Sequence, residues 1–137
     1  MAFNIRRVNY YYITIKDEPG QAYQILDSIS GLGINLLAFT AIPMGGNSTQ
    51  LTLFPDDDHD LNSLAVSSGL KIEGPHPAFL VQGDDKLGAL TQVHYKFFLA
   101  NINVYASSGV SDGRGSFGYI IYVKPEDFEH AAKALEL

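Results

Sequence analysis

The first half of the chain switches between strand-like and helix-like patterns of apolar residues. Val8–Lys16 is rich in Tyr, Ile, Thr and Val, which predicts a strand. Asp17-Glu18-Pro19-Gly20 interrupts this strand, and an acidic residue followed by proline is typical of a helix N-terminus. Apolar residues then recur at helical spacing until Gly31 and Gly33, which predicts one helix with a single apolar side. These apolar residues are Ala22, Ile25, Leu26, Ile29 and Leu32.

Two more strands, a short helix and a fourth strand are predicted before the middle of the chain. The strands are Ile34–Ile42, Gln50–Phe54 and Leu70–Glu73, with a turn at Pro43–Asn47 between the first two. Asp56–Asp60 opens the short helix, and its apolar residues Leu61, Leu64 and Ala65 face inward. Gly74-Pro75-His76-Pro77 is predicted to be a linker, because Gly and Pro interrupt regular structure.

The second half repeats this order of elements. A strand at Ala78–Gln82 leads into a turn at Asp84–Gly88 and then into a helix. Strands at Asn103–Ala106 and Gly118–Val123 flank a predicted hairpin turn at Ser111–Gly115. Another helix follows. The apolar residues are Leu90, Val93, Phe97 and Ala100 on the first of these helices, and Phe128, Ala131, Ala132 and Leu135 on the second.

The two halves are related by a shift of 68 positions. The shift places Asp17 on Asp85, Gly20 on Gly88, Ile34 on Ile102, Asn35 on Asn103 and Gly45 on Gly113. Such self-similarity indicates a repeated structural unit. Each copy reads strand–helix–strand–strand–helix–strand, so we predict an α+β fold of two ferredoxin-like βαββαβ domains in tandem, with antiparallel sheets and helices on one face. The predicted domains are residues 1–74 and 75–137.

The second copy stops where its fourth strand would begin, and a surplus segment, residues 1–8, precedes the first copy. We therefore expect this N-terminal extension to fill the vacant edge of the second sheet, in its own chain or in a partner. Copies of this size have small cores, so we also expect them to pack on each other or on a second chain, in a homodimer.

Composition restricts the classes of function. Among 137 residues, 46% hydrophobic and 18% charged residues are typical of a folded globular protein. The absence of cysteine excludes disulfides, thiol nucleophiles and zinc–thiolate sites. A formal charge of −6 disfavours nucleic acid as a partner. The chain shows neither a signal-peptide pattern nor an apolar stretch of membrane-spanning length, so we expect a cytoplasmic protein without membrane contact.

Tyr10–Gly20, the single helix after it and then Gly33-Ile34-Asn35-Leu36 resemble the ACT domain, and the resemblance covers nearly the whole chain as a tandem pair. ACT domains are small regulatory modules that bind amino acids, often attached to enzymes of amino-acid metabolism. The resemblance implies a ligand between the first strand–helix turn of one domain and the second strand of its neighbour. The residues implied are Asp17, Glu18, Pro19, Gly20 and Asn35, with Asp84, Asp85, Gly88 and Asn103 in the second copy. Leu87 departs from the pattern, because it stands where proline is expected.

The chemistry of these residue types suits an amino acid. A helix N-terminus offers backbone N–H groups and the positive end of the helix dipole to a carboxylate, and glycine allows a ligand to approach the main chain. Aspartate can take the ammonium group, and asparagine carries both a donor and an acceptor. A second interpretation stays open, in which Asp17 and Asp85 only cap helices while Asn35 and Asn103 only satisfy the chain that leaves the helix.

Three other patterns suggest weaker hypotheses. Gly113–Gly118 matches G-x-G-x-x-G but leads into a strand instead of a helix, so we interpret it as a hairpin turn. Phe117–Tyr122 resembles the end of the RNP1 signature, in which Tyr119 or Tyr122 would stack bases, but the acidic balance argues against RNA. Asp56–Asp60 lacks the spacing of an EF-hand, and we interpret it as a solvated helix start.

The four histidines show no metal-ligand spacing. His94 falls on the position of the inward Leu26, which predicts an imidazole in the core or at an interface, whereas His59, His76 and His130 are expected to be exposed. No nucleophile or paired carboxylates stand in a catalytic arrangement, so we predict no catalysis, no cofactor and no metal.

We therefore predict a free-standing, allosteric amino-acid sensor or regulatory subunit that is not an enzyme. Its expected partners are an amino acid or related small molecule, a second copy in a homodimer, and an enzyme of amino-acid metabolism. Binding at the junction of the two halves would stabilise one domain or subunit arrangement that a partner reads. We expect one good site instead of two equal ones, since the first copy has the fuller motif. The alternatives are a purely structural oligomerisation module and an RNA-binding protein of the RRM type.

Overall fold

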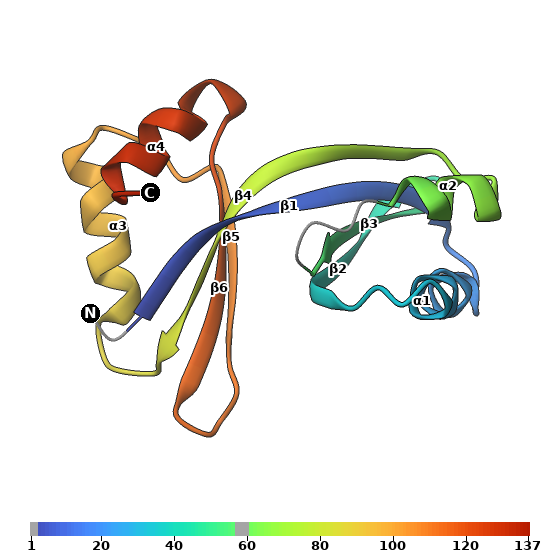
Figure 1. The fold of residues 1–137 in the computed structure, drawn as a ribbon, viewed down its shortest axis with the longest axis horizontal. Coiled ribbons are helices and arrows are strands. Elements are labelled where there is room, and N and C mark those ends of the chain that lie inside the picture. Colours follow the sequence, from blue (N-terminus) through green and yellow to red (C-terminus); the bar gives the residue numbers. More distant parts are fainter. Residues whose placement is uncertain (1–2, 57–60) are drawn as a thin grey trace. The chain divides into compact units, whose positions relative to one another are not determined.

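A computed structural model describes residues 3–56 and 61–137 as an α+β fold (Figure 1). In this described part, a six-stranded antiparallel sheet has the strand order β2-β3-β1-β4-β6-β5. The elements are β1 (Phe3–Lys16), α1 (Gln21–Gly31), β2 (Leu36–Gly45), β3 (Ser48–Pro55), α2 (Asn62–Ser68), β4 (Ile72–Asp84), α3 (Ala89–Leu99), β5 (Ala106–Ser111), β6 (Ser116–Tyr122), a 3-10 turn at Pro125–Asp127, and α4 (Phe128–Ala134).

The contacts divide the chain into two compact units. The first unit is Asn9–His76, and the second unit is the chain up to Val8 together with Pro77–Leu137. Both β1 and β4 therefore contribute to each unit. Within the described residues, 3–56 and 61–137, no helix is both long and apolar enough to cross a membrane.

In the first unit, α1 and α2 cover a sheet that is built around β3. β3 pairs with β1 on one side and with β2 on the other, both antiparallel. Alternate residues of β1 and β3 point into the core, where they meet the apolar side of α1 as its helical spacing predicts. Leu61 and Leu64 are fully buried there, which confirms their predicted inward position. The other buried core residues are Tyr11, Ile13, Ile15, Ile25, Ile29, Ile34, Leu51 and Leu53.

In the second unit, α3 and α4 cover the strands β4, β6 and β5 (Figure 1). Phe79 of β4 stacks on Phe128 of α4, with ring centroids 4.5 Å apart. Phe97 of α3 packs against the same Phe79 ring at 6.3 Å. The apolar residues predicted for the last helix, Phe128, Ala131, Ala132 and Leu135, are all buried in this core. The predicted hairpin turn at Ser111–Gly115 is confirmed, since β5 and β6 pair across it.

The N-terminal segment is part of β1 and belongs to the second unit. The strand begins at Phe3, five residues before the predicted start at Val8. Phe3 and Ile5 pack against the second core, and β1 is the neighbour of β4 in the sheet. Arg7 forms an ion pair with Glu129 of α4 at 2.9 Å. This segment of the chain therefore occupies the edge of the second unit's sheet, the position for which the repeat supplies no strand.

The predicted linker Gly74–Pro77 is not a break, and the two strands predicted on either side of it are one strand, β4. Gly and Pro are local signals for a turn, but pairing with neighbouring strands carries β4 through them. His76, predicted to be exposed, is half-buried, and its ring centroid lies 5.3 Å from that of Tyr10. Most of the acidic run Asp56–Asp60, residues 57–60, lies outside the described residues, as does His59.

Candidate functional site

Both units contain the same turn between their first strand and first helix. The backbone N–H of Asp17 donates to the carbonyl oxygen of Asn47 at 2.7 Å. In the second unit the backbone N–H of Asp85 donates to the carbonyl oxygen of Gly115 at 2.9 Å. Both bonds join equivalent positions, because 17 and 85 as well as 47 and 115 are separated by 68. The repeat in the sequence is thus a repeat in backbone geometry.

A glycine in left-handed conformation begins each helix. Gly20 has φ 88° and is the N-cap of α1, and Gly88 has φ 81° and is the N-cap of α3. Side chains rarely adopt this conformation, which explains the glycine at both places. Neither helix has a side-chain capping bond, so the interpretation that Asp17 and Asp85 cap the helices is wrong. The first N–H groups of both helices lack intrahelical partners, as at any helix start.

The two predicted asparagines lie outside the strands in which they were expected. Asn35 precedes β2, and its carbonyl oxygen accepts a hydrogen bond from the backbone N–H of Asp56 at 2.8 Å. Asn103 lies between α3 and β5, because β5 begins only at Ala106. Both asparagines are exposed. The predicted strand at Asn103–Ala106 is therefore wrong, since regular pairing with β6 runs only from Ala106 onward.

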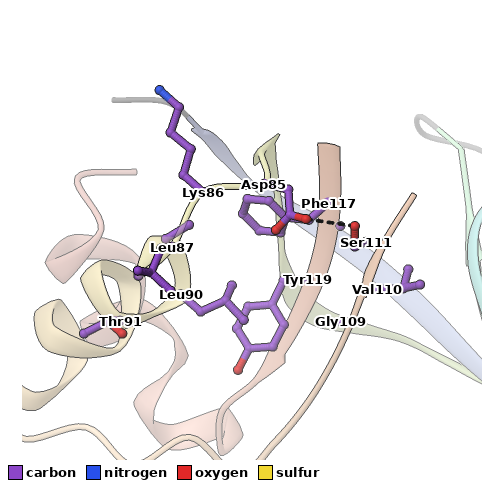
Figure 2. A pocket seen from close by; sticks show the side chains of 13 residues that line it. Asp85, Lys86, Leu87, Leu90, Thr91, Gly109, Val110, Ser111, Phe117 and Tyr119 are labelled. Carbon is purple, nitrogen blue, oxygen red and sulfur yellow. Dashed lines mark hydrogen bonds between the residues drawn. The ribbon is translucent and has the colours of Figure 1, made fainter. Parts of the chain in front are cut away.

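The second unit has a pocket of about 690 Å³ between the start of α3 and the β5–β6 hairpin (Figure 2). It includes Asp85 and Gly88 from the predicted site. Asp84 is the last residue of β4, directly before Asp85 in the chain, and neither Asp84 nor Asn103 lines the pocket. The first-copy residues Asp17, Glu18, Pro19 and Gly20 are exposed in the equivalent turn of the first unit. The lining residues are Asp85–Thr91 from the turn and helix, Gly109, Val110 and Ser111 from β5, and Phe117, Gly118 and Tyr119 from β6.

One edge of this pocket is polar, and its walls are largely apolar. The Ser111 hydroxyl donates to Oδ2 of Asp85 at 2.9 Å, which holds the carboxylate toward β5 (Figure 2). The Lys86 side chain points away from the other lining side chains. Leu90 and Phe117 supply apolar walls beside the carboxylate. The pocket therefore combines a single inward acid with the exposed N-terminus of α3 and apolar surface.

Tyr119 is the most buried residue of the lining. It is 6% exposed, and its hydroxyl lies 2.6 Å from Nε2 of His94 on α3. Gly109 stands opposite Tyr119 in the hairpin, and a Cβ added there would lie 2.7 Å from Cδ1 of Tyr119. Gly109 is thus required by the close approach of this ring and not by a left-handed backbone. At the equivalent positions, the first copy has Leu51 for Tyr119 and Leu26 for His94.

These residues were missed as parts of a site. Tyr119 entered the sequence argument only as a base-stacking candidate, yet it is buried in the second core and cannot stack a base from an open sheet face. The alignment of His94 with Leu26 predicted an imidazole in the core or at an interface; His94 is half-buried, and its Nε2 lies against the hydroxyl of the buried Tyr119. The observed register pairs Gly109 with Tyr119 and is centred on residue 114, one position after the centre of the predicted turn, so the predicted turn would have paired Gly109 with Phe117 instead.

No family model matches the chain, and no curated protein matches its sequence. Solved structures do match its fold. Protein BT0572 from Bacteroides thetaiotaomicron has a TM-score of 0.78 at 11% identity, covering 96% of this chain and 88% of that one. The regulatory subunit of aspartate kinase from Thermus thermophilus has a TM-score of 0.63 at 14% identity, covering 99% and 95%. The corresponding subunit from Thermus flavus has a TM-score of 0.61 at 17% identity, again covering 99% and 95%.

The fold is ACT-like. At these identities the similarity concerns the fold alone. The similar structures include regulatory subunits of aspartate kinase. The match to each of the two Thermus subunits extends over nearly the whole of both chains.

Proposed function

We propose that this protein is a non-enzymatic regulatory protein that senses an amino acid, built from two ferredoxin-like, ACT-like domains in tandem. The observation that carries the proposal is the pocket at the start of α3, where Asp85 and Gly88 of the repeated turn meet the β5–β6 hairpin. The fold shared with regulatory subunits of aspartate kinase supports the same class of function. A ligand at the junction of the two copies, with Asp17–Gly20, Asn35 and Asn103 taking part, stays a prediction.

The pocket offers complementary partners to the two charged groups of an amino acid. The N–H groups of Leu90 and Thr91 are in the first turn of α3, where a carboxylate is stabilised by the helix dipole and by unpaired donors. Asp85 is the acid that faces the pocket, and its bond to Ser111 leaves carboxylate lone pairs for an ammonium group. The two charged groups of the ligand would thus lie across the turn.

The ligand's side chain would extend over the apolar lining. Leu90, Val110, Phe117 and the ring of Tyr119 supply this surface. Because Lys86 points away and Asp85 is taken by the ammonium, no charged group remains for a charged ligand side chain. We therefore expect an amino acid with an uncharged side chain.

The proposed regulatory step is a shift of population. A ligand that touches both the α3 turn and the hairpin stabilises the conformation in which these two elements are held together. A partner enzyme that binds this conformation better is controlled by the ligand, and by linkage it raises the ligand's affinity by the same factor.

Thermal-shift screening of the full chain with the twenty amino acids tests the proposal. An amino acid with an uncharged side chain should raise the melting temperature, since a ligand at a hundred times its Kd stabilises the folded state by about 2.7 kcal/mol. Asp85→Asn should weaken binding by about tenfold or more, because it removes the charge and keeps the shape. The matched control is Asp17→Asn in the equivalent turn, which should bind normally.

Three other outcomes of these binding experiments would contradict the proposal or favour an alternative. No shift with any amino acid would contradict the proposal and leave the structural oligomerisation module standing. Loss of binding in Asp17→Asn, with binding kept in Asp85→Asn, would move the site to the first copy. Retention of mixed RNA on a filter at low salt would favour the RRM-type alternative.

A further inference from the structure

The pocket at the start of α3 contains a tyrosine whose ring is held from two directions. Tyr119 of β6 is 6% exposed, and its hydroxyl lies 2.6 Å from Nε2 of His94 on α3. Either the hydroxyl donates to an unprotonated Nε2 or a protonated Nε2 donates to the hydroxyl oxygen, so the hydroxyl is paired in both tautomers. The backbone of Gly109 lies beside the same ring, since a Cβ there would be 2.7 Å from Cδ1 of Tyr119. His94 does not line the pocket, so it can act on a ligand only through Tyr119.

The first unit has the same hairpin and helix without this polar pair. Leu51 stands at the position of Tyr119, and Leu26 stands at the position of His94. Leu51 also pairs across its hairpin with the equivalent of Gly109, so the two hairpins have the same register at this point. Leucines pack without hydrogen-bond partners, whereas a buried hydroxyl is costly unless it is paired. The repeated fold therefore does not require the tyrosine and the histidine, and their place at the pocket indicates a role in binding.

The hairpin side of the pocket offers no unengaged hydroxyl to a ligand. Of the residues that β5 and β6 supply to the lining, only Ser111 and Tyr119 have polar side chains. The Ser111 hydroxyl donates to Oδ2 of Asp85 at 2.9 Å and accepts a backbone N–H of the hairpin turn at 3.2 Å. The Tyr119 hydroxyl is bonded to His94. The remaining side-chain surface on this side is apolar and includes Phe117 and the ring of Tyr119.

We propose that His94 is a positioning residue that sets the specificity of the pocket, and that the sensed amino acid carries an apolar side chain. This inference rests on the function proposed above and narrows the ligand from uncharged to apolar. The bond to His94 engages the hydroxyl of Tyr119 and makes the ring an apolar wall. A polar ligand side chain would leave water without gaining a partner at this wall, whereas an apolar one buries its surface against the ring, Leu90 and Phe117.

Isothermal titration calorimetry of the full chain with pairs of amino acids of similar size tests the specificity. The pairs are valine and threonine, leucine and asparagine, methionine and glutamine, and phenylalanine and tyrosine. In each pair that binds, the apolar member should bind about tenfold to a hundredfold more tightly, because an apolar pocket rejects a polar analogue of similar size by no more than this.

Two substitutions of matched polarity test whether His94 sets this preference. His94→Gln places an amide at about the reach of Nε2, so it should keep the bond to Tyr119 and the wild-type ratio of the two dissociation constants in a pair. The amide of His94→Asn is too short to reach the hydroxyl. The freed hydroxyl can then bond to a polar ligand side chain, and the ratio should fall by about tenfold.

A double substitution separates this effect from a general loosening of the pocket. His94→Leu, which installs the residue of α1, should lower the ratio as His94→Asn does. His94→Leu/Tyr119→Phe also removes the freed hydroxyl and keeps the ring, so it should return the ratio to that of the wild type. A loosened pocket would not regain its preference in this way. The melting temperature of each variant checks that it is folded.

The outcomes distinguish this inference from the proposed function. If none of the twenty amino acids binds, the proposed function fails and this inference fails with it. If the wild type binds an amino acid with a polar side chain most tightly, and Asp85→Asn loses that binding, the proposed function stands and the apolar specificity is wrong. A wild-type ratio in both His94→Leu and His94→Asn would show that His94 does not determine the specificity.

Discussion

In both units the chain leaves a strand, passes an exposed aspartate and starts a helix at a left-handed glycine. The surroundings of the two turns differ. In the second unit Tyr119, His94 and Gly109 line or support a pocket beside the turn, while the first copy has Leu51, Leu26 and Ala41 at these positions. The two turns share a backbone, but different side chains surround them. The side chains of a distant hairpin decide what the turn can bind.

The largest expected effect comes from removing residues 1–8. The second unit would lose an edge strand together with the contacts of Phe3 and Ile5 in its core. Two fully buried side chains of this kind contribute roughly 3–6 kcal/mol to the free energy of unfolding, and the partly buried Phe3 and Ile5 contribute less, to which the lost pairing of the strand adds. Urea unfolding should therefore show a destabilised second unit and a first unit that is less affected. Asn4→Ser is the control, because Asn4 is exposed; unchanged melting after the deletion would contradict this role of β1.

Gly109→Ala should come next, with a loss of about 1–3 kcal/mol from overpacking against Tyr119. The double substitution Gly109→Ala/Tyr119→Leu, which copies Ala41 and Leu51 of the first unit, should recover part of this loss. Chemical unfolding of the single and double variants measures the coupling between the two positions. Additive effects would mean that the ring does not restrict position 109.

Gly20→Ala and Gly88→Ala should have the smallest effect, about 1–2 kcal/mol each, because an alanine is strained at positive φ. A Cβ has open space at both positions, so the cost should be similar in the two units. Thermal unfolding checks this equality. A much larger loss at one glycine would show that the two turns are less alike than their hydrogen bonds indicate.

Much of the fold follows from local patterns. The stripe of Ile25 and Ile29 predicted α1, and the run at Val8–Lys16 predicted most of β1. The errors occur where long-range pairing overrides local signals. β4 runs through Gly74–Pro77, and β5 starts three residues after Asn103. Periodicity cannot show such boundaries, because they depend on where a neighbouring strand offers partners.

The candidate site was predicted only in part. Asp85 and Gly88 were recognised from the repeat, and both line the pocket. Ser111 and Tyr119 were not, although they hold or complete its walls. Nothing in the residue types alone distinguishes Tyr119 from an ordinary strand tyrosine.

The sequence by itself determined the duplicated turns, since spacing of aspartate and glycine and the need for positive φ are properties of a few neighbouring residues. Only the tertiary structure placed a pocket beside the turn at Asp85. Asp85 meets Ser111 across 26 positions, and His94 meets Tyr119 across 25. Such contacts form when the β5–β6 hairpin packs against the helix, and the free energy that selects them comes from burial of the whole second core.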